Sequence, residues 1–206
     1  MLGETYAETG EAPDWERLLS RREIYPPNRV PMGGLFLTAG VDVQADRIEC
    51  SLYAWGRDRQ RWLVEHAVLM GRTTEDKVWA DLTAWKHRSW KHEGGADMSI
   101  VRLAIDTGHE TNRVYQWVRT QGSETLAVDG RSSLFGSLVG QPTSVDVDIS
   151  GRKVRRGVKL WPVDVSKLKH ELYGSLGLAR PEGGDYPAGW VHLSESVADP
   201  EFLKQL

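Results

Sequence analysis

Cysteine is almost absent from this chain: Cys50 is the only one among 206 residues. A lone cysteine excludes an internal disulfide and a cysteine-based zinc site, and it fits a reducing compartment. The sequence also lacks a run of about 18 apolar residues, so we expect no membrane span. The acidic, polar N-terminus does not have the features of a signal peptide. No GxxxxGK[S/T] motif occurs, which excludes a P-loop nucleotide site within this chain.

A large excess of charge of one sign is missing as well, because the formal net charge is only -3. Any contact with nucleic acid must therefore come from local basic clusters. The densest cluster lies in "GRKVRRGVK" and contains Arg152, Lys153, Arg155, Arg156 and Lys159. Such a cluster can bind the DNA backbone by releasing counterions. A solvated hairpin is an equally good interpretation of the same residues.

Hydrophobic periodicity predicts an α/β protein with one mixed sheet. An antiparallel meander of three strands comes first, and strands that alternate with helices follow it. We expect the strand order 3-2-1-4-5 with helices on both faces. The predicted strands are 35–43, 47–55, 61–69, 99–106, 124–130, 157–165 and 188–196. The predicted helices are 73–87, 110–121, 166–177 with Ser166 as N-cap, and one that begins at Asp199.

Two further segments do not follow this pattern. Residues 1–34 are acidic and then rich in proline and glycine, which is typical of a tail or linker. The domain is therefore expected to span 35–206. Residues 130–157 are predicted to be a mobile loop or a hairpin.

Two predicted strands carry an acid where apolar residues are expected. Asp42 lies within the first strand, and Asp106 ends the fourth. If these strands are parallel neighbours, the two carboxylates meet at the carboxyl edge of the sheet, where open α/β sheets place their sites. Close carboxylates repel unless a cation or a proton joins them, and oxygen ligands favour Mg²⁺ or Mn²⁺. The alternative is that each aspartate only forms a turn or caps a helix. Glu49 is assigned to the surface, on the face opposite Cys50.

Several separated blocks resemble one known family. In order they are "LFLTAGVDVQADRIE", "LAIDTGHETNRVYQWVR", "VKLWPVDVSKLKHELYGSL" and "GWVHLSES". They are similar to the C-terminal nuclease region of tailed-phage terminase large subunits of the lambda-like branch. The lead-in "GEAPDWERLLSRREIYP" resembles the connector between the packaging ATPase and the nuclease in that family. Residues 1–34 would then be a linker from an ATPase domain that this chain lacks, so no ATPase activity is expected.

The resemblance implies an RNase H-like fold and an endonuclease that depends on divalent metal, with a two-ion site for Mg²⁺ or Mn²⁺. It also implies that the enzyme cuts concatemeric phage DNA during genome packaging. Carried over by position, Asp42 and Asp106 are the metal ligands. The family usually adds an acid from a later helix, which is not found before Leu206, so a C-terminal truncation is expected. Asp164 is the in-chain substitute, with the lead-in to a helix as its alternative role.

Other implications concern partners. Double-stranded DNA is the expected substrate, and Lys167 and His109 are candidates for phosphate contact beside the basic cluster. Ordinary solvated or loop positions are the alternatives for both residues. The terminase small subunit and the portal are implied as partners of the full-length protein, in the cytoplasm of the bacterial host and without a membrane.

Two alternative classes of function remain. One is a non-catalytic RNase H-like module that binds DNA or a partner. The other is an actin-like protein that binds a sugar or nucleotide, for which "DTGHE" is only a weak match to the required glycine-rich loops.

Overall fold

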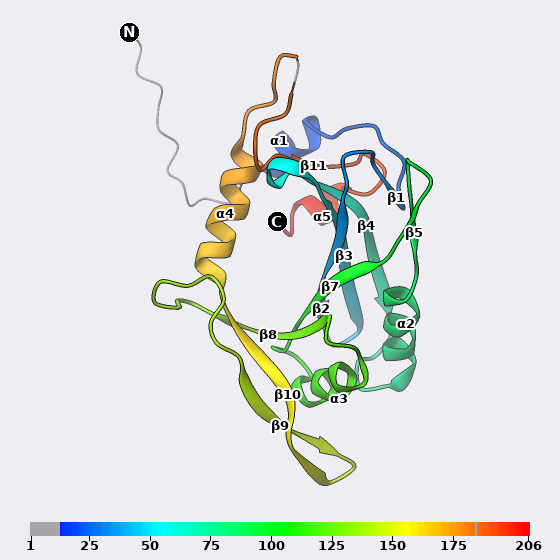
Figure 1. Cartoon of the computed structure of the whole chain (residues 1–206), viewed down its shortest axis with the longest axis vertical. Helices are drawn as coiled ribbons and strands as arrows, with labels where there is room; N and C mark the ends of the chain where they lie inside the picture. The colour runs from blue at the N-terminus through cyan, green and yellow to red at the C-terminus, as the bar shows by residue number, and fades with distance from the viewer. Residues whose placement is uncertain (1–12, 184) are drawn as a thin grey trace.

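A computed structural model describes residues 13–183 and 185–206. In this part of the chain an eight-stranded mixed sheet is flanked by helices, and a small three-stranded sheet lies beside it (Figure 1). The strands are β1 Arg29–Val30, β2 Phe36–Val43, β3 Arg47–Trp55, β4 Arg61–Met70, β5 Trp90–His92, β6 Asp97–Met98, β7 Ile100–Asp106, β8 Thr125–Arg131, β9 Thr143–Ile149, β10 Arg152–Asp164 and β11 Val191–His192. The helices are α1 Trp15–Ser20, the 3-10 turn Arg57–Arg59, α2 Asp76–Lys86, α3 Thr111–Thr120, α4 Val165–Gly177 and α5 Pro200–Leu203.

The large sheet has the order β11-β4-β3-β2-β7-β8-β10-β9. β2, β3 and β4 form the expected antiparallel meander, and β7 pairs with β2 in parallel. β8 and β10 continue the parallel part. Of the segment 130–157, the greater part belongs to the hairpin of β9 and β10, which projects from the body of the molecule in Figure 1. The predicted mixed α/β sheet with helices on both faces is therefore confirmed.

Two hydrophobic cores lie on opposite faces of the sheet. Alternating residues of β2 and β3 face α2 and α3, which supply tryptophans to the larger core. The smaller core lies near the β4 edge and joins α1, the C-terminal part of α4, β11 and α5. On that second face, Asp42 near the end of β2 is exposed, and Asp106 at the end of β7 is half-buried.

The segment that the sequence assigned to a linker packs in part against the domain. Leu18 of α1 is fully buried in the smaller core. The guanidinium of Arg21 donates to the carbonyl oxygens of Leu176, at 2.6 Å, and Val191, at 2.8 Å. Residues far apart in the sequence thus hold α1 in place. The division at residue 34 stays a prediction, but residues 15–30 contribute to the fold.

A buried acid–imidazole pair completes this attachment. The carboxylate of Glu23 lies 2.7 Å from Nδ1 of His192 and accepts a 2.9 Å hydrogen bond from the indole of Trp190. The His192 ring stacks on Trp62 of β4 at 4.4 Å between centroids. Burial opposes ionisation of Glu23, but the hydrogen bonds from His192 and Trp190 outweigh it and lower the pKa of this carboxyl.

None of the helices in the described ranges is long and apolar enough to cross a membrane.

Shortening Leu18 tests whether the N-terminal segment belongs to the fold. Leu18→Ala should lower the free energy of unfolding by about 2–5 kcal/mol, because it leaves a cavity in the smaller core. The matched control is Ile24→Ala in the same segment, where the side chain is 92% exposed and the change should stay within about 0.5 kcal/mol. Urea unfolding followed by circular dichroism measures both. Equal stability of the two variants would mean that the segment is detached in solution.

Candidate active site at the carboxyl edge of β2 and β7

The parallel register of β2 and β7 places the two candidate acids side by side. Val41 and Ile105 are Cα partners, and the next residues along the two strands are Asp42 and Asp106. Neighbouring strands lie about 4.8 Å apart, and residues at matched positions point to the same face. The two carboxylates therefore project from adjacent backbones on the face opposite the larger core.

Asp42 is exposed rather than buried among apolar residues. Burial alternates along β2, so that Leu37, Ala39, Val41 and Val43 are buried while Asp42 faces outward. The apolar run in the sequence suggested that Asp42 lies in a buried stretch of strand, but its side chain is exposed. Gln44 donates a 2.9 Å hydrogen bond to the carboxylate, and Oδ2 of Asp106 accepts one from the amide of Gly108 at 2.9 Å.

Glu49 is a third acid beside this pair, and the sequence analysis missed it. It is the Cα partner of Asp42 on β3 and is only 8% exposed, so its assignment to the surface was wrong. Arg47 donates to it at 2.6 Å, and Nε2 of His66 lies 3.9 Å away. Strand alternation and antiparallel pairing put Glu49 next to Asp42. Arg47 and His66 lie next to its carboxylate, and residues from the far end of the chain line the same pocket.

A pocket of about 330 Å³ is lined by Asp42, Glu49 and His66, whereas Asp106 is not among its lining residues. Its walls also include Ser51, whose hydroxyl lies 3.1 Å from Nδ1 of His66, and the C-terminal residues Phe202, Gln205 and Leu206. The His66 ring contacts Phe202 at 4.7 Å between centroids. Burial lowers the pKa of His66, although the charge of Glu49 opposes this shift. A neutral imidazole is therefore favoured next to the carboxylates.

Carboxylate oxygens are ligands for hard cations such as Mg²⁺, which can bind a substrate phosphate at the same time. Within residues 13–183 and 185–206, no group of three or more histidine, cysteine and acidic side chains could hold a metal ion. Mg²⁺, however, commonly uses one or two carboxylates and completes its shell with water and substrate phosphates. Asp42 and Asp106 meet that lower requirement.

Comparison with known proteins identifies the family. All residues from 1 to 206 match the family described as "Terminase large subunit gpA, endonuclease domain". The chain belongs to this family. It is 30% identical over 197 residues to the terminase large subunit of Escherichia phage lambda, which covers 93% of this chain and 29% of the relative. It is also 30% identical over 178 residues to that of Enterobacteria phage P21, with 85% and 26% covered.

The chain thus spans less than a third of the length of either terminase large subunit. No solved structure matches it.

Asp164, the proposed third acid, lies at the N-terminus of α4. Its Oδ1 accepts from the amide of Lys167 at 3.0 Å, and its Oδ2 from the amide of Leu134 at 2.8 Å. It is 1% exposed, and it caps α4 in place of the predicted Ser166. Two strands, β8 and β10, follow β7 in the sheet, so Asp164 is not on a strand adjacent to Asp106. These contacts support a structural role for it in the terminase domain.

The two candidates for phosphate contact, Lys167 and His109, lie in different surroundings. The ammonium of Lys167 donates to the carbonyl of Leu134 at 2.9 Å and lies 3.3 Å from Asp164. It therefore holds the loop before β9 to α4 rather than pointing freely toward a phosphate. His109 lies in the loop directly after Asp106 and is half-buried.

The basic cluster lies on the projecting hairpin. Arg152, Lys153 and Arg155 line a hollow of about 550 Å³ together with Arg119 of α3. Lys153 pairs with Asp146 at 3.2 Å, whereas among the described residues the guanidinium groups of Arg152 and Arg155 form no ion pair. The tip is held near the start of α3, where Asn112 exchanges hydrogen bonds with the backbone of Asp148 at 2.9 and 3.0 Å. α3 begins shortly after Asp106, so the hairpin is anchored beside the candidate site.

Acid titration tests the structural role of Asp164. The amides of Leu134 and Lys167 hold the pKa of this carboxyl below its usual range. Its ionised form therefore stabilises the fold above the unfolded pKa of about 3.9, and this contribution is lost as pH falls through the lower folded pKa. Asp164→Asn should lower stability at neutral pH and flatten the loss of stability between about pH 5 and pH 3.

Urea midpoints across that pH series measure the effect. Asp97→Asn, which removes an exposed carboxylate paired with Lys91, controls for the loss of one acid at the surface. An unchanged acid profile in Asp164→Asn would contradict the capping role.

Proposed function

We propose that this chain is the DNA-cutting domain of a terminase large subunit, an endonuclease that needs Mg²⁺ or Mn²⁺. In the full-length protein it would cut concatemeric phage DNA during packaging, in the host cytoplasm and together with a small subunit and a portal. The observation that supports this most strongly is the placement of Asp42 and Asp106 side by side at the carboxyl edge of parallel strands. Family membership supports the same reaction.

An RNase H-like fold fits the arrangement of the central strands. Strands β2 to β4 form an antiparallel meander. Parallel strand β7 pairs with β2, and β8 follows on the other side of β7. Helices α2 and α3 cover one face, and α4 and α5 lie on the other (Figure 1). This leaves the acids on an accessible face that a DNA strand can approach.

In this proposal each residue of the site has a separate role. Asp42 and Asp106 would hold a divalent ion, which would supply the Lewis acidity for hydrolysis of a phosphodiester. Glu49 lies beside Asp42, held by Arg47, and is placed to orient groups around the ion or to accept a proton. His66, kept neutral by burial, can hydrogen-bond within the same pocket. The rigid strands beneath fix the spacing, which preorganised sites require.

A non-catalytic binding module is the second candidate. It is favoured by the lack of a three-ligand metal group among the described residues. A cleavage assay distinguishes the two candidates, since a binding module would hold DNA in the presence of Mn²⁺ without cutting it.

Neutralising either strand acid tests the proposed reaction. Asp42→Asn and Asp106→Asn should each reduce cleavage of plasmid DNA in Mn²⁺ to the level seen with EDTA. Both should stay folded, because removing one member of a repelling pair does not cost stability. Asp97→Asn, an exposed acid on β6 that pairs with Lys91, is the matched control and should cut like the wild type.

Agarose gels of nicked and linear product measure the rates, and circular dichroism checks folding. Full cleavage activity in Asp42→Asn or Asp106→Asn would contradict the assignment of these acids to the active site. If the wild type binds DNA but never cuts it, the binding module is favoured. Asp164→Asn in the same assay, well below its melting temperature, decides whether Asp164 contributes to cutting.

The hairpin is proposed to bind the DNA backbone. Arg152→Gln with Arg155→Gln should weaken binding to all duplex sequences alike. The double variant should also reduce the slope of log affinity against log salt by about 0.9 for each lost phosphate contact. Lys77→Gln on α2, which removes an exposed lysine paired with Asp81, is the control. Fluorescence anisotropy in EDTA measures binding without cleavage, and an unchanged slope would assign the cluster to solvent.

A further inference from the structure

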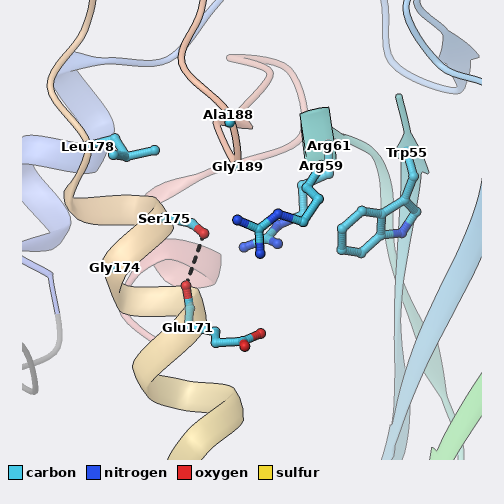
Figure 2. Close-up of a pocket in the computed structure, with 9 residues that line it drawn as sticks. All are labelled: Trp55, Arg59, Arg61, Glu171, Gly174, Ser175, Leu178, Ala188 and Gly189. Atoms are coloured by element: carbon cyan, nitrogen blue, oxygen red, sulfur yellow. Dashed lines mark hydrogen bonds between the residues drawn. The ribbon is translucent and has the colours of Figure 1, made fainter. Parts of the chain in front are cut away.

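A second pocket, of about 320 Å³, lies at the far end of β3 from the acids. Trp55 at the end of β3, Arg59 in the following turn and Arg61 at the start of β4 form one wall. Glu171 and Ser175 of α4 form the other (Figure 2). Figure 2 shows both guanidinium groups directed into the space between Trp55 and α4.

The two arginines bring like charges together: Arg59 is exposed, whereas Arg61 is partly buried and its guanidinium lies over the ring of Trp55. In the described ranges, neither guanidinium makes a hydrogen bond or an ion pair, although Glu171 lines the same pocket. Burial lowers the pKa of Arg61, and the neighbouring charge of Arg59 adds to this effect, whereas Tyr53 and Glu171 oppose it. A partly buried guanidinium normally finds an anionic or hydrogen-bonding partner. An anion in this pocket would supply it.

The turn that carries Arg59 is strained. Asp58 and Arg59 have φ angles of 54° and 58°, the left-handed region that residues other than glycine rarely adopt. The amide of Gly189 donates to the carbonyl of Asp58 at 2.7 Å, and that of Gly56 to Gln60 at 2.9 Å, which holds the turn in place. Backbone strain of this kind persists where surrounding contacts impose it and is concentrated at ligand sites.

Trp55 adds a fixed aromatic wall. Its indole N–H donates to the hydroxyl of Thr38 at 2.7 Å, and the guanidinium carbon of Arg61 lies 5.2 Å from its ring centroid. These contacts orient Arg61 across the pocket. Arginine forks match the oxygens of a phosphate in a bidentate manner, better than an ammonium does.

The pocket shares a face of the sheet with the candidate acids. Side chains alternate along β3, so Trp55 points to the same face as Glu49, the partner of Asp42. Six residues of strand at about 3.4 Å each separate Trp55 from Glu49 by roughly 20 Å.

We propose that the pocket of Trp55, Arg59 and Arg61 binds a phosphate group of the DNA. The choice of DNA as the source of the phosphate rests on the proposed function. The pocket would act as a second anchor for the DNA, away from the acids that lie at the bond to be cut.

Arg61→Gln tests this anchor. Measured by anisotropy of a labelled duplex in EDTA, it should weaken binding and reduce the salt slope by about 0.9, the value for one phosphate contact. Arg61→Lys keeps the charge and should keep the slope. Arg57→Gln, in the same turn but lining a different hollow with Met32 and Trp62, is the matched control and should bind like the wild type.

The outcomes separate the alternatives. An unchanged affinity and slope in a folded Arg61→Gln would overturn the proposal. Thermal stabilisation by inorganic phosphate, compared with chloride at equal ionic strength, is the second arm. If phosphate stabilises the wild type but not Arg61→Gln, and duplex binding is the same in both, the pocket takes a free phosphate and the DNA assignment fails.

Binding is read without metal, so its result does not depend on cleavage. Normal cutting by Asp42→Asn would reject the proposed site of cutting while leaving the measured slope of Arg61→Gln interpretable.

Discussion

The parallel register between β2 and β7 is the constraint on which the rest of the candidate site depends. With Val41 opposite Ile105, both apolar side chains enter the larger core, and the residues after them, Asp42 and Asp106, face the open side together. A slip of one residue would turn every side chain of a strand to the other face. It would bury a carboxylate against α2 and α3 and expose leucine and valine. The hydrophobic core therefore fixes the position of the acids, and no direct bond between them is needed.

Residues of both hydrophobic cores pack against the strands and side chains that surround the acids. β2 and β3 are held from below by the tryptophans of α2 and α3. From above, α5 contributes Phe202, which covers His66 and closes the pocket beside Glu49. A carboxylate with few partners is costly in such a setting unless a cation joins it. Asp42 avoids that cost by staying exposed, and Glu49 avoids it through Arg47.

Local pattern predicted much of this and failed where distant residues decide. The meander, the alternating strands and helices, and the placement of Asp42 and Asp106 followed from periodicity and strand pairing. The burial of Glu49 did not, because the residues around it in the pocket come from β4 and the C-terminal segment as well as from β3. Asp164 accepts a hydrogen bond from the amide of Leu134, 30 residues earlier in the chain, and no local pattern predicts that contact. Likewise, the docking of Leu18 and Arg21 depends on contacts with α4 and β11 that no local pattern contains.

The attachment of α1 has a mechanical consequence. Arg21 binds the carbonyl oxygens of Leu176 and Val191, and α1 packs against α5, whose Phe202 touches His66 in the acid pocket. A force applied to the chain before α1 is therefore transmitted directly through these contacts. It loads the end of α4, the edge strand β11 and the helix that closes the pocket, all through short contacts between buried groups. Tension on the N-terminal segment would thus reach the wall of the site and the edge strand β11 before it reaches the inner strands of the sheet.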